Sequence, residues 1–495
     1  MHSATVRFVT ELTGVDEITS RATRLRTLVF LVTSLGAFMG SLDLSIVNVA
    51  FPALERSFSG DTTAALAWVI TAYSITYGSL LVIAGRTADR IGSRKVFNIG
   101  LSVFCLGSAL CAAAPSVPFL IAGRVIQGSG AAAMLPASLS LLLAAYPQER
   151  RTQIVSLWGG IGALAVATGP TLGATLVTVG GWRWVFLVNL PVGAFAFLMG
   201  RKVLTETPVK AHHPAPDYLG AVFISGALAS LVLAITQGPS WGWTSVRVIV
   251  TLVASLLLGT VFIYRCRHHN EPVLDLTLFR ARSFSVTNVA TLLYSMGFFA
   301  MLLGNILFLT SVWHYQIIWA GLAVTPGPLV VASVAGPAGR LAARIGFRPV
   351  LMAGTSFFTL GLLLFALRVG LHPDYLAVWL PATIVLGFGI GLTFPVLGAT
   401  AVSSLQPERY AVGSAVNQTA RQIGGAIGIA VLVVILGAPH TATSALDHFH
   451  HLWYFSASMA ALSGLAVCFL AKGRQRIGGA NATTDVETKP ATETT

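Results

Sequence analysis

Long apolar runs separated by short polar breaks follow one another from residue 27 almost to the end of the chain. Each run approaches or exceeds the roughly 20 residues with which a helix crosses the hydrocarbon core of a bilayer. A membrane β-barrel would instead show alternating strands of about ten residues. The pattern therefore predicts an all-α integral membrane protein with fourteen spans, at residues 27–52, 66–84, 96–114, 118–145, 153–178, 184–204, 217–237, 246–264, 284–310, 318–338, 348–368, 376–402, 411–436 and 452–471.

The breaks between the runs carry turn or charge signals. PQERR follows the fourth run, GGWR the fifth and GPSWGW the seventh. The first run is too long for the core of a removable signal peptide, so we interpret it as a membrane span. Residues 473–495 are polar and rich in threonine, a composition that predicts a disordered tail.

Basic residues gather on one side of the predicted bundle once the N-terminus is placed in the cytoplasm. Most of the 31 lysines and arginines then fall in cytoplasmic segments. The exceptions are four arginines on the outer side and two within spans, namely Arg56, Arg183, Arg247 and Arg368, then Arg124 and Arg421. This distribution satisfies the positive-inside rule and predicts that both termini are cytoplasmic. It also accounts for the net charge of +13, so nucleic-acid binding is not needed to explain that charge.

A thirteen-residue pattern occurs twice in the chain. GRTADRIGSRKVF, residues 85–97, joins spans two and three, and GRLAARIGFRPVL, residues 339–351, joins spans ten and eleven. Eight of the thirteen positions are identical, and Asp89 of the first copy corresponds to Ala343 of the second. A single basic loop would indicate only topology, but its repetition predicts a duplicated unit. Duplicated helical bundles are the architecture of alternating-access carriers.

The repeat predicts two pseudo-symmetric six-helix bundles with spans seven and eight inserted between them. The predicted segments are a cytoplasmic N-terminal tail at 1–26, the N-terminal bundle at 27–205, the inserted pair with its flanking loops at 206–283, the C-terminal bundle at 284–472 and a cytoplasmic tail at 473–495.

Two opposite charges are predicted to lie deep in the first bundle. Asp43 is the one acidic residue well inside a span, and a rise of 1.5 Å per residue places it at a depth similar to that of Arg124. A charge at mid-bilayer costs about 2.5–3.5 kcal/mol or more, and pairing lowers that cost. Arg124 favours release of the Asp43 proton whereas burial favours the neutral acid, so we predict a proton-coupling site. A static ion pair that holds two helices together is the alternative interpretation.

Arg421, within NQTARQIGGAIG at residues 417–428, is the other ionisable side chain deep in a span. It either lines a cavity in the second half or extends along its helix to the cytoplasmic surface. The sequence leaves both interpretations open.

These motifs resemble those of the major facilitator superfamily, and in particular its fourteen-helix drug:proton antiporters. The loop at 85–97 is similar to the superfamily's loop signature, departing from it at Thr87 and Ser93. LDLSIVNVAFP (42–52), RVIQGSGAA (124–132) and GWRWVFLVNLPVG (181–193) resemble motifs of the first, fourth and sixth helices. The resemblance implies that the loop gates the transport cycle, through residues Gly85, Asp89, Arg90, Gly92 and Arg94.

ATGPTLGA, residues 167–174, resembles the antiporter signature of the fifth helix more loosely. It keeps Gly169, Pro170 and Gly173 but has Ala165 and Ala174 where glycines are usual. Pro170 removes one backbone hydrogen bond and bends the helix, and the small residues allow close helix packing. A bent, tightly packed helix is suited to sealing the protein against proton leak, although ordinary membrane packing explains the same residues.

The sequence excludes several classes of protein. With 55% hydrophobic and 10% charged residues and a mean hydropathy of +0.76, the chain is far from a soluble domain, which carries about 25% charged residues. It contains neither a nucleotide-binding glycine-rich loop with its lysine nor a set of catalytic residues, so we expect no enzyme activity and no cofactor. The four cysteines show no metal-like spacing. HTATSALDHFHH, residues 440–451, is expected to be an outer loop rather than a metal site.

We therefore expect a monomeric exporter of amphipathic drugs, antibiotics or metabolites in the plasma membrane of a bacterium, driven by protons. A nutrient importer or facilitator of the same superfamily is the alternative. One titrating acid predicts one proton per substrate and favours neutral, zwitterionic or monocationic substrates over dications. Helix position suggests cavity residues, which are Asn48, Trp68, Tyr73, Gln127, Asn288, Tyr294, Asn305, Asn417 and Arg421.

Overall fold

The computed structural model describes residues 2–206, 216–403, 405–406, 409–437 and 441–470, and all regular structure in these ranges is helical. The elements are α1 (His2–Ser57), α2 (Thr63–Ile91), α3 (Ser93–Ala113), α4 (Val117–Ala145), α5 (Gln148–Gly180), α6 (Trp184–Leu187), α7 (Asn189–Val203), α8 (Tyr218–Trp241), α9 (Val246–His268), η1 (Leu276–Arg280), α10 (Arg282–Ser311), α11 (Ile317–Val324), α12 (Pro326–Ile345), α13 (Phe347–Arg368), η2 (Tyr375–Trp379), α14 (Leu380–Ser403), α15 (Tyr410–Leu436) and α16 (Ala442–Val467). The expectation of an all-helical membrane protein is confirmed.

Every predicted span coincides with a helix or with two consecutive helices, but the count of fourteen is not confirmed. Among the described residues, 12 helices are long and apolar enough to cross a bilayer, and α5, bent by 42°, makes a thirteenth if it is one span. The last predicted span falls on α16, which is not among them. The first turns of α16 carry Asp447, His448, His450 and His451, which lower its apolar character. The predicted tail at 473–495 lies outside the described residues.

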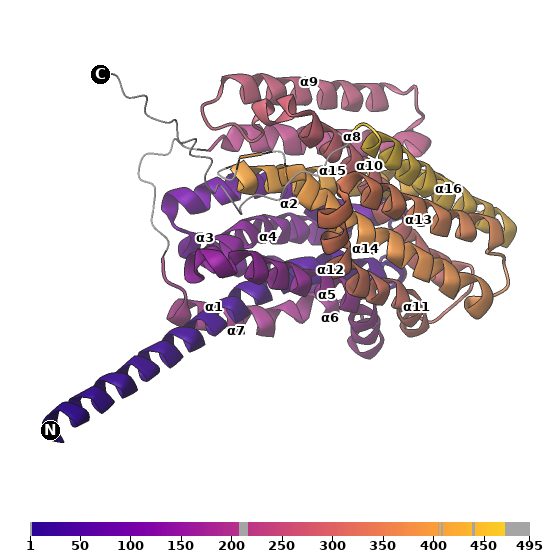
Figure 1. Cartoon of the computed structure of the whole chain (residues 1–495). Helices are drawn as coiled ribbons and strands as arrows, with labels where there is room; N and C mark the ends of the chain where they lie inside the picture. The colour runs from indigo at the N-terminus through magenta and orange to yellow at the C-terminus, as the bar shows by residue number, and fades with distance from the viewer. Residues whose placement is uncertain (1, 207–215, 404, 407–408, 438–440, 471–495) are drawn as a thin grey trace, which may run out of the picture.

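The helices form two groups joined along a long interface (Figure 1). Helices α1 to α7 pack mainly against one another, and so do α10 to α16. The groups meet where α2 packs along α15, and where α5 contacts α11 and α12. Helices α8 and α9 pair with each other, and α8 lies against α2 and α15. The residue ranges predicted for the two bundles and for the inserted pair remain predictions.

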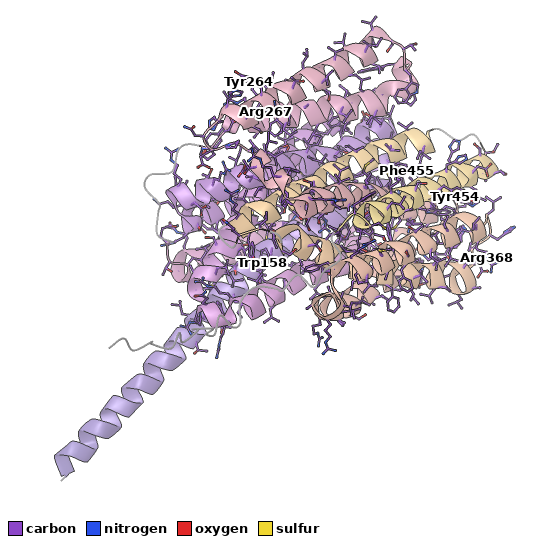
Figure 2. The ribbon with its side chains drawn as sticks, turned by 45° about the horizontal axis from the view of Figure 1, so that its top comes forward. Trp158, Tyr264, Arg267, Arg368, Tyr454 and Phe455 are labelled. Carbon is purple, nitrogen blue, oxygen red and sulfur yellow. The ribbon has the colours of Figure 1, made fainter. Side chains whose placement is uncertain are left out.

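Helix α9 lies at the edge of the bundle and turns an apolar face outward. Figure 2 shows Tyr264 and Arg267 on this outer helix and Arg368 at the far end of α13. Large apolar side chains of α9 are exposed, among them Val250, Leu256 and Leu257. In a membrane protein such a face is covered by lipid, so the outward position of α9 agrees with its composition.

The repeated sequence motif produces the same turn in both halves. Gly92, between α2 and α3, has φ of 103°, and its N–H donates to Ala88 O at 3.0 Å. Gly346, between α12 and α13, has φ of 96° and donates to Ala342 O at 2.9 Å. This region of φ is strained for residues with a Cβ atom, which explains why glycine stands at both positions.

Two segments differ from the expected organisation at the ends of the bundle. The predicted N-terminal tail, residues 1–26, is helical from His2 and forms the first turns of α1, which extend away from the bundle (Figure 1). The expected outer loop at 440–451 is helical from Ala442, because the Thr441 hydroxyl caps the helix by accepting a hydrogen bond from Ser444 N at 3.1 Å. His440 lies outside the described residues.

The histidines of this segment contact the exposed carbonyl ends of neighbouring helices. His448 Nδ1 lies 2.7 Å from Leu436 O at the end of α15, and His450 Nε2 lies 2.9 Å from Val369 O after α13. Carbonyls at helix ends lack intrahelical donors, so these contacts fix α16 against α13 and α15.

Candidate functional site

Asp43 of α1 and Arg124 of α4 form a buried ion pair in the first group of helices. Arg124 Nη1 donates to Asp43 Oδ2 at 2.6 Å, and both residues are only 1% exposed. Arg124 Nε also donates to the backbone O of Val69 on α2 at 2.9 Å. A rise of 1.5 Å per residue predicted that both residues lie at a similar depth, and their contact agrees with the predicted pairing.

Gln127, which the sequence suggested only as a cavity residue, completes this pair. Its Nε2 donates to Asp43 Oδ1 at 2.8 Å, and its Oε1 accepts from Arg124 Nη1 at 2.6 Å. Both Asp43 oxygens are therefore bound by donors. The i, i+3 spacing of Arg124 and Gln127 places them on one face of α4, which was the available signal.

The hydrogen-bond network extends from Gln127 to two further helices. Gln127 Nε2 also donates to Ser108 Oγ of α3 at 2.7 Å, and Asn189 Nδ2 of α7 donates to the same hydroxyl at 3.1 Å. Arg124 lies over the ring of Tyr73 of α2, 4.1 Å from its centroid. Asp43 thus sits at the centre of a network that includes five helices of the first group. A change of the charge on Asp43 would therefore alter contacts made by all five helices.

The bent helix α5 is held against α1 by a contact that compensates for Pro170. Proline has no N–H, so the carbonyl four residues earlier, that of Val166, lacks its helical donor. Ser45 Oγ of α1 donates to Val166 O at 3.1 Å and replaces it. A Cβ atom on Gly169 would lie 2.5 Å from Ser45 Oγ, and one on Gly173 would lie 2.8 Å from Ile46 Cγ1. The glycines of this motif are therefore required for the close approach of α1 and α5.

The C-terminal half of α5 also reaches the second group of helices. Thr171 and Thr325 share a hydrogen bond of 2.7 Å between their hydroxyls, and a Cβ atom on Gly321 would lie 2.8 Å from Pro170 O. Closer to the N-terminus of α5 and the C-terminus of α12, by contrast, Cβ atoms on Gly160 and Gly336 would meet no atom within 4 Å. The two groups are thus in contact around Pro170 and Thr171 of α5.

The loop between α2 and α3 is tied to segments that the sequence did not connect to it. Asp89 and Arg90 are exposed, Gly85 is half-buried and Gly92 is buried at the turn. Arg94 N donates to Glu206 Oε1 at 2.9 Å, and its Nη2 donates to Arg201 O at 2.8 Å. The carboxylate of Glu206 therefore caps the start of α3, where helix dipole and free N–H groups favour a negative charge.

The inserted pair α8–α9 contacts the same loop through charged residues. Arg86 forms a 2.8 Å ion pair with Glu271, which follows α9. Asp217, at the start of α8, pairs with Arg265 of α9 at 2.6 Å and accepts from Gly220 N at 2.9 Å. Burial raises the pKa of the Asp217 carboxyl, but the Arg265 and Gly220 hydrogen bonds outweigh burial and hold the pKa below its usual value.

In the second group, polar side chains of α15 face α2, α10 and α14. Asn417 Nδ2 donates to Thr291 Oγ1 at 2.8 Å and to Asn288 Oδ1 at 3.3 Å, both on α10. Arg421 lies over the ring of Phe394, 4.0 Å from the centroid. Buried Gln422 packs against Gly78 of α2, where a Cβ atom would lie 2.9 Å from Gln422 Cβ. This helix therefore places an arginine and buried amides at the junction of the two groups.

The remaining predicted cavity residues have varied surroundings. Asn48 Nδ2 donates to Leu44 O of its own helix at 2.7 Å, and Trp68 packs in an apolar cluster of α2, α8 and α15. Asn305 Oδ1 accepts from Trp453 Nε1 at 3.0 Å within the second group, and Tyr294 is buried against Phe358 and Phe394. Of the predicted site residues that the structure describes, Arg124, Gln127 and Tyr73 gather around Asp43. Within the described ranges, no three His, Cys, Asp or Glu side chains gather to hold a metal ion.

Comparison with known proteins gives consistent relatives. A sequence profile of the Major Facilitator Superfamily matches residues 33–429. The chain is 35% identical over 423 residues to the "Multidrug resistance protein Stp" of Mycobacterium tuberculosis, covering 85% of this chain and 78% of that protein. It is 33% identical to the "Methylenomycin A resistance protein" of Bacillus subtilis, covering 88% and 90%. The crystal structure of an auto-inhibited POT family peptide transporter shares the fold, with a TM-score of 0.65, 17% identity and coverage of 94% and 99%.

Proposed function

The chain belongs to the major facilitator superfamily, and from this premise we propose that it exports amphipathic drugs, antibiotics or metabolites in exchange for protons. It is a multi-pass protein of the bacterial inner membrane. The relatives at 33–35% identity are named for drug and antibiotic resistance, which supports transport of a drug-like molecule out of the cell. The nutrient importer suggested as an alternative has no such support among them.

The proposed architecture has fourteen membrane-spanning helices, with α8 and α9 as a pair inserted between two six-helix bundles. The lengths of α5 and α16, 33 and 26 residues, are sufficient for both to cross the bilayer. We place both termini in the cytoplasm from the distribution of arginine and lysine. The proposed protein acts as a monomer.

The observation that carries the proposal is the buried network around Asp43. A carboxylate whose two oxygens accept hydrogen bonds from Arg124 and Gln127 is stable only while it is charged and paired. Protonation removes the charge that Arg124 neutralises and converts one oxygen of Asp43 into a donor. The contacts among α1, α2 and α4 must then rearrange, which links proton binding to helix movement.

The other two motifs take supporting roles in this proposal. The packing of α5 on α1 through Ser45 and Gly169 closes the path beside Asp43, so that protons cross only with substrate. The loop at residues 85–94 changes its contacts when the cytoplasmic side opens, and the surface position of Asp89 and Arg90 gives their side chains room for such a change.

Replacement of Asp43 by asparagine tests the proposal. Asparagine has nearly the same shape as aspartate and cannot titrate, so the Asp43→Asn variant should be inserted at normal amounts and should no longer accumulate substrate against a gradient. The assay is transport of a fluorescent drug into inverted membrane vesicles with an imposed pH gradient. Downhill exchange of the same drug is the control for folding. If the variant still builds a drug gradient, Asp43 is a structural residue and the coupling site lies elsewhere. If wild-type right-side-out vesicles accumulate the drug instead, the protein is an importer.

A further inference from the structure

Arg421 is a half-buried arginine without a countercharge in the part of the chain that the structure describes. It makes no hydrogen bond or ion pair there, and its Nε is buried without a partner. The titratable groups within electrostatic range are the phenols of Tyr77 and Tyr294, which are neutral near pH 7. Arg124, the buried arginine of the first group, has Asp43, Gln127 and Val69 as partners. The difference between the two arginines requires an explanation.

The position of Arg421 excludes the surface as its partner. Arg421 lies about 16 Å along the axis of α15 from Tyr410 at 1.5 Å per residue. Its guanidinium stacks on Phe394, which itself lies about 13 Å from the cytoplasmic end of α14. The side chain therefore points across the bundle toward α14 and does not extend along α15 to the lipid headgroups. Of the two interpretations that the sequence left open, the inward-facing one agrees with this geometry.

Gln422 beside it adds a second set of unsatisfied groups. Gln422 is fully buried, and neither its Nε2 nor its Oε1 has a hydrogen-bond partner among the described residues. More than nine in ten buried polar groups in proteins are paired with protein or water. Two consecutive residues of α15, at the junction of both helix groups, therefore have polar groups available to a ligand.

Aromatic side chains complete the surroundings of the guanidinium. Phe394 contacts Tyr294 and Phe298 edge-to-face, with ring centroids 5.0 and 4.9 Å apart. A planar guanidinium beside a cluster of rings suits a ligand with an apolar body and a planar acid group, because a carboxylate accepts two parallel N–H bonds from arginine. We propose that Arg421 binds the carboxylate of an anionic, amphipathic substrate, with the α10 and α14 rings against its apolar part.

This inference rests on the proposed transport function, since it names the substrate class that the protein would move. It differs from the expectation from sequence alone, which favoured neutral, zwitterionic or monocationic substrates. That expectation considered only the acid at Asp43 and not the missing countercharge at Arg421.

Equilibrium binding to the purified full-length protein tests the inference without any pH gradient, so its outcome does not depend on export or proton coupling. The probes are 1-pyrenebutyrate, its uncharged methyl ester and 1-pyrenemethylamine, which share one apolar body. The wild type should bind the carboxylate at least about tenfold more tightly than the ester. Arg421→Gln should weaken carboxylate binding by about 10- to 100-fold, the effect of one hydrogen-bonded charge, and change ester binding by less than about twofold.

Two controls separate binding from folding. Arg368→Gln removes an exposed arginine at the outer end of α13 (Figure 2) and should leave the affinity for all three probes unchanged. Arg421→Lys keeps the charge but loses the planar pair of donors, so it should give an intermediate affinity for the carboxylate. Since Arg421 has no hydrogen-bond or ion-pair partner to lose among the described residues, the melting temperature of Arg421→Gln should equal or exceed that of the wild type.

Three results would overturn the inference. Equal affinity of the wild type for the acid and the ester would show that no carboxylate is recognised, and this needs no variant. If Arg421→Gln lost affinity for all three probes equally, or if its melting temperature fell, Arg421 would be a structural residue. If sodium chloride or acetate raised the melting temperature of the wild type as much as pyrenebutyrate does, a small inorganic or organic counter-ion would occupy the site.

Discussion

The contact between Ser45 and Val166 gives a quantitative test of why α5 bends and how it stays packed. Ser45→Ala removes the donor to Val166 O, a carbonyl that Pro170 has already deprived of its helical partner. A partly buried carbonyl left without a donor costs about 1–2 kcal/mol in the free energy of unfolding. In a Pro170→Ala background the new N–H at position 170 can donate to Val166 O. There, Ser45→Ala should cost no more than about 0.5 kcal/mol, the ordinary value for a redundant hydrogen bond.

The double-mutant cycle therefore predicts a coupling energy of about 1 kcal/mol between two residues on different helices. We would measure the free energy of unfolding of the four proteins in mixed micelles with increasing detergent denaturant. Passive proton leak into proteoliposomes would be recorded with a pH-sensitive dye, and Ser45→Ala alone should leak fastest. Ser129→Ala is the matched control, because Ser129 Oγ donates to Val125 O within α4, which keeps its own backbone donor. Additive costs for Ser45→Ala and Pro170→Ala would refute the account of this contact.

Three further predictions concern the cytoplasmic side and the topology. Asp89→Asn should leave the amount of protein in the membrane unchanged and slow substrate efflux several-fold, whereas Ala343→Ser in the second copy of the loop should leave the rate unchanged. Asp217→Asn should lower the free energy of unfolding by about 1 kcal/mol, because the Arg265 pair is partly exposed; since the pKa of Asp217 is lowered, this contribution is complete above its ordinary pKa of 3.8 and is lost only as the pH falls further. A reporter fused after Trp243 should lie outside and one at the C-terminus in the cytoplasm.

Much of the fold follows from the order of apolar and polar residues, because lipid forces each backbone polar group to be paired within a helix. The helices appear where the apolar runs predict them, and both repeated turns are closed by glycines with positive φ. The runs do not reveal breaks within a span. Helices α11 and α12 are separate because the chain turns at Thr325 before Pro326, and α6 ends where α7 begins at Asn189. Nor does an apolar run reveal that a helix such as α16 begins before it, with turns rich in histidine.

The sequence predicted the candidate site only where the free-energy cost of a charge in the bilayer, or the depth of the residue, left few possible partners. A lone acid and a lone arginine at similar depth in one half of a membrane protein have few alternatives to pairing, so Asp43 and Arg124 could be matched from sequence. Contacts made by uncharged groups carry no such penalty. Ser45 is one of many serines, and its bond to Val166 depends on the register of α1 against α5. The ion pair of Arg86 with Glu271 joins exposed segments far apart in the chain, which hydropathy does not constrain.

In the proposed exchange, the charges bound at Asp43 and Arg421 determine how far the membrane potential can drive transport. Each proton that would enter through Asp43 moves one charge, which is worth about 2.3 kcal/mol per 100 mV. For a neutral substrate this supports a gradient of roughly 50-fold, at 1.36 kcal/mol per factor of ten. A monoanion bound at Arg421 and carried outward moves a second charge in the favourable direction, which raises the limit to roughly 2,000-fold for the same 100 mV. A monocation cancels the charge of the proton and gains nothing from the potential. In the proposed exchange, the single coupling acid Asp43, which would limit a cation exporter, is sufficient for strong export of carboxylates, the substrate class proposed for Arg421.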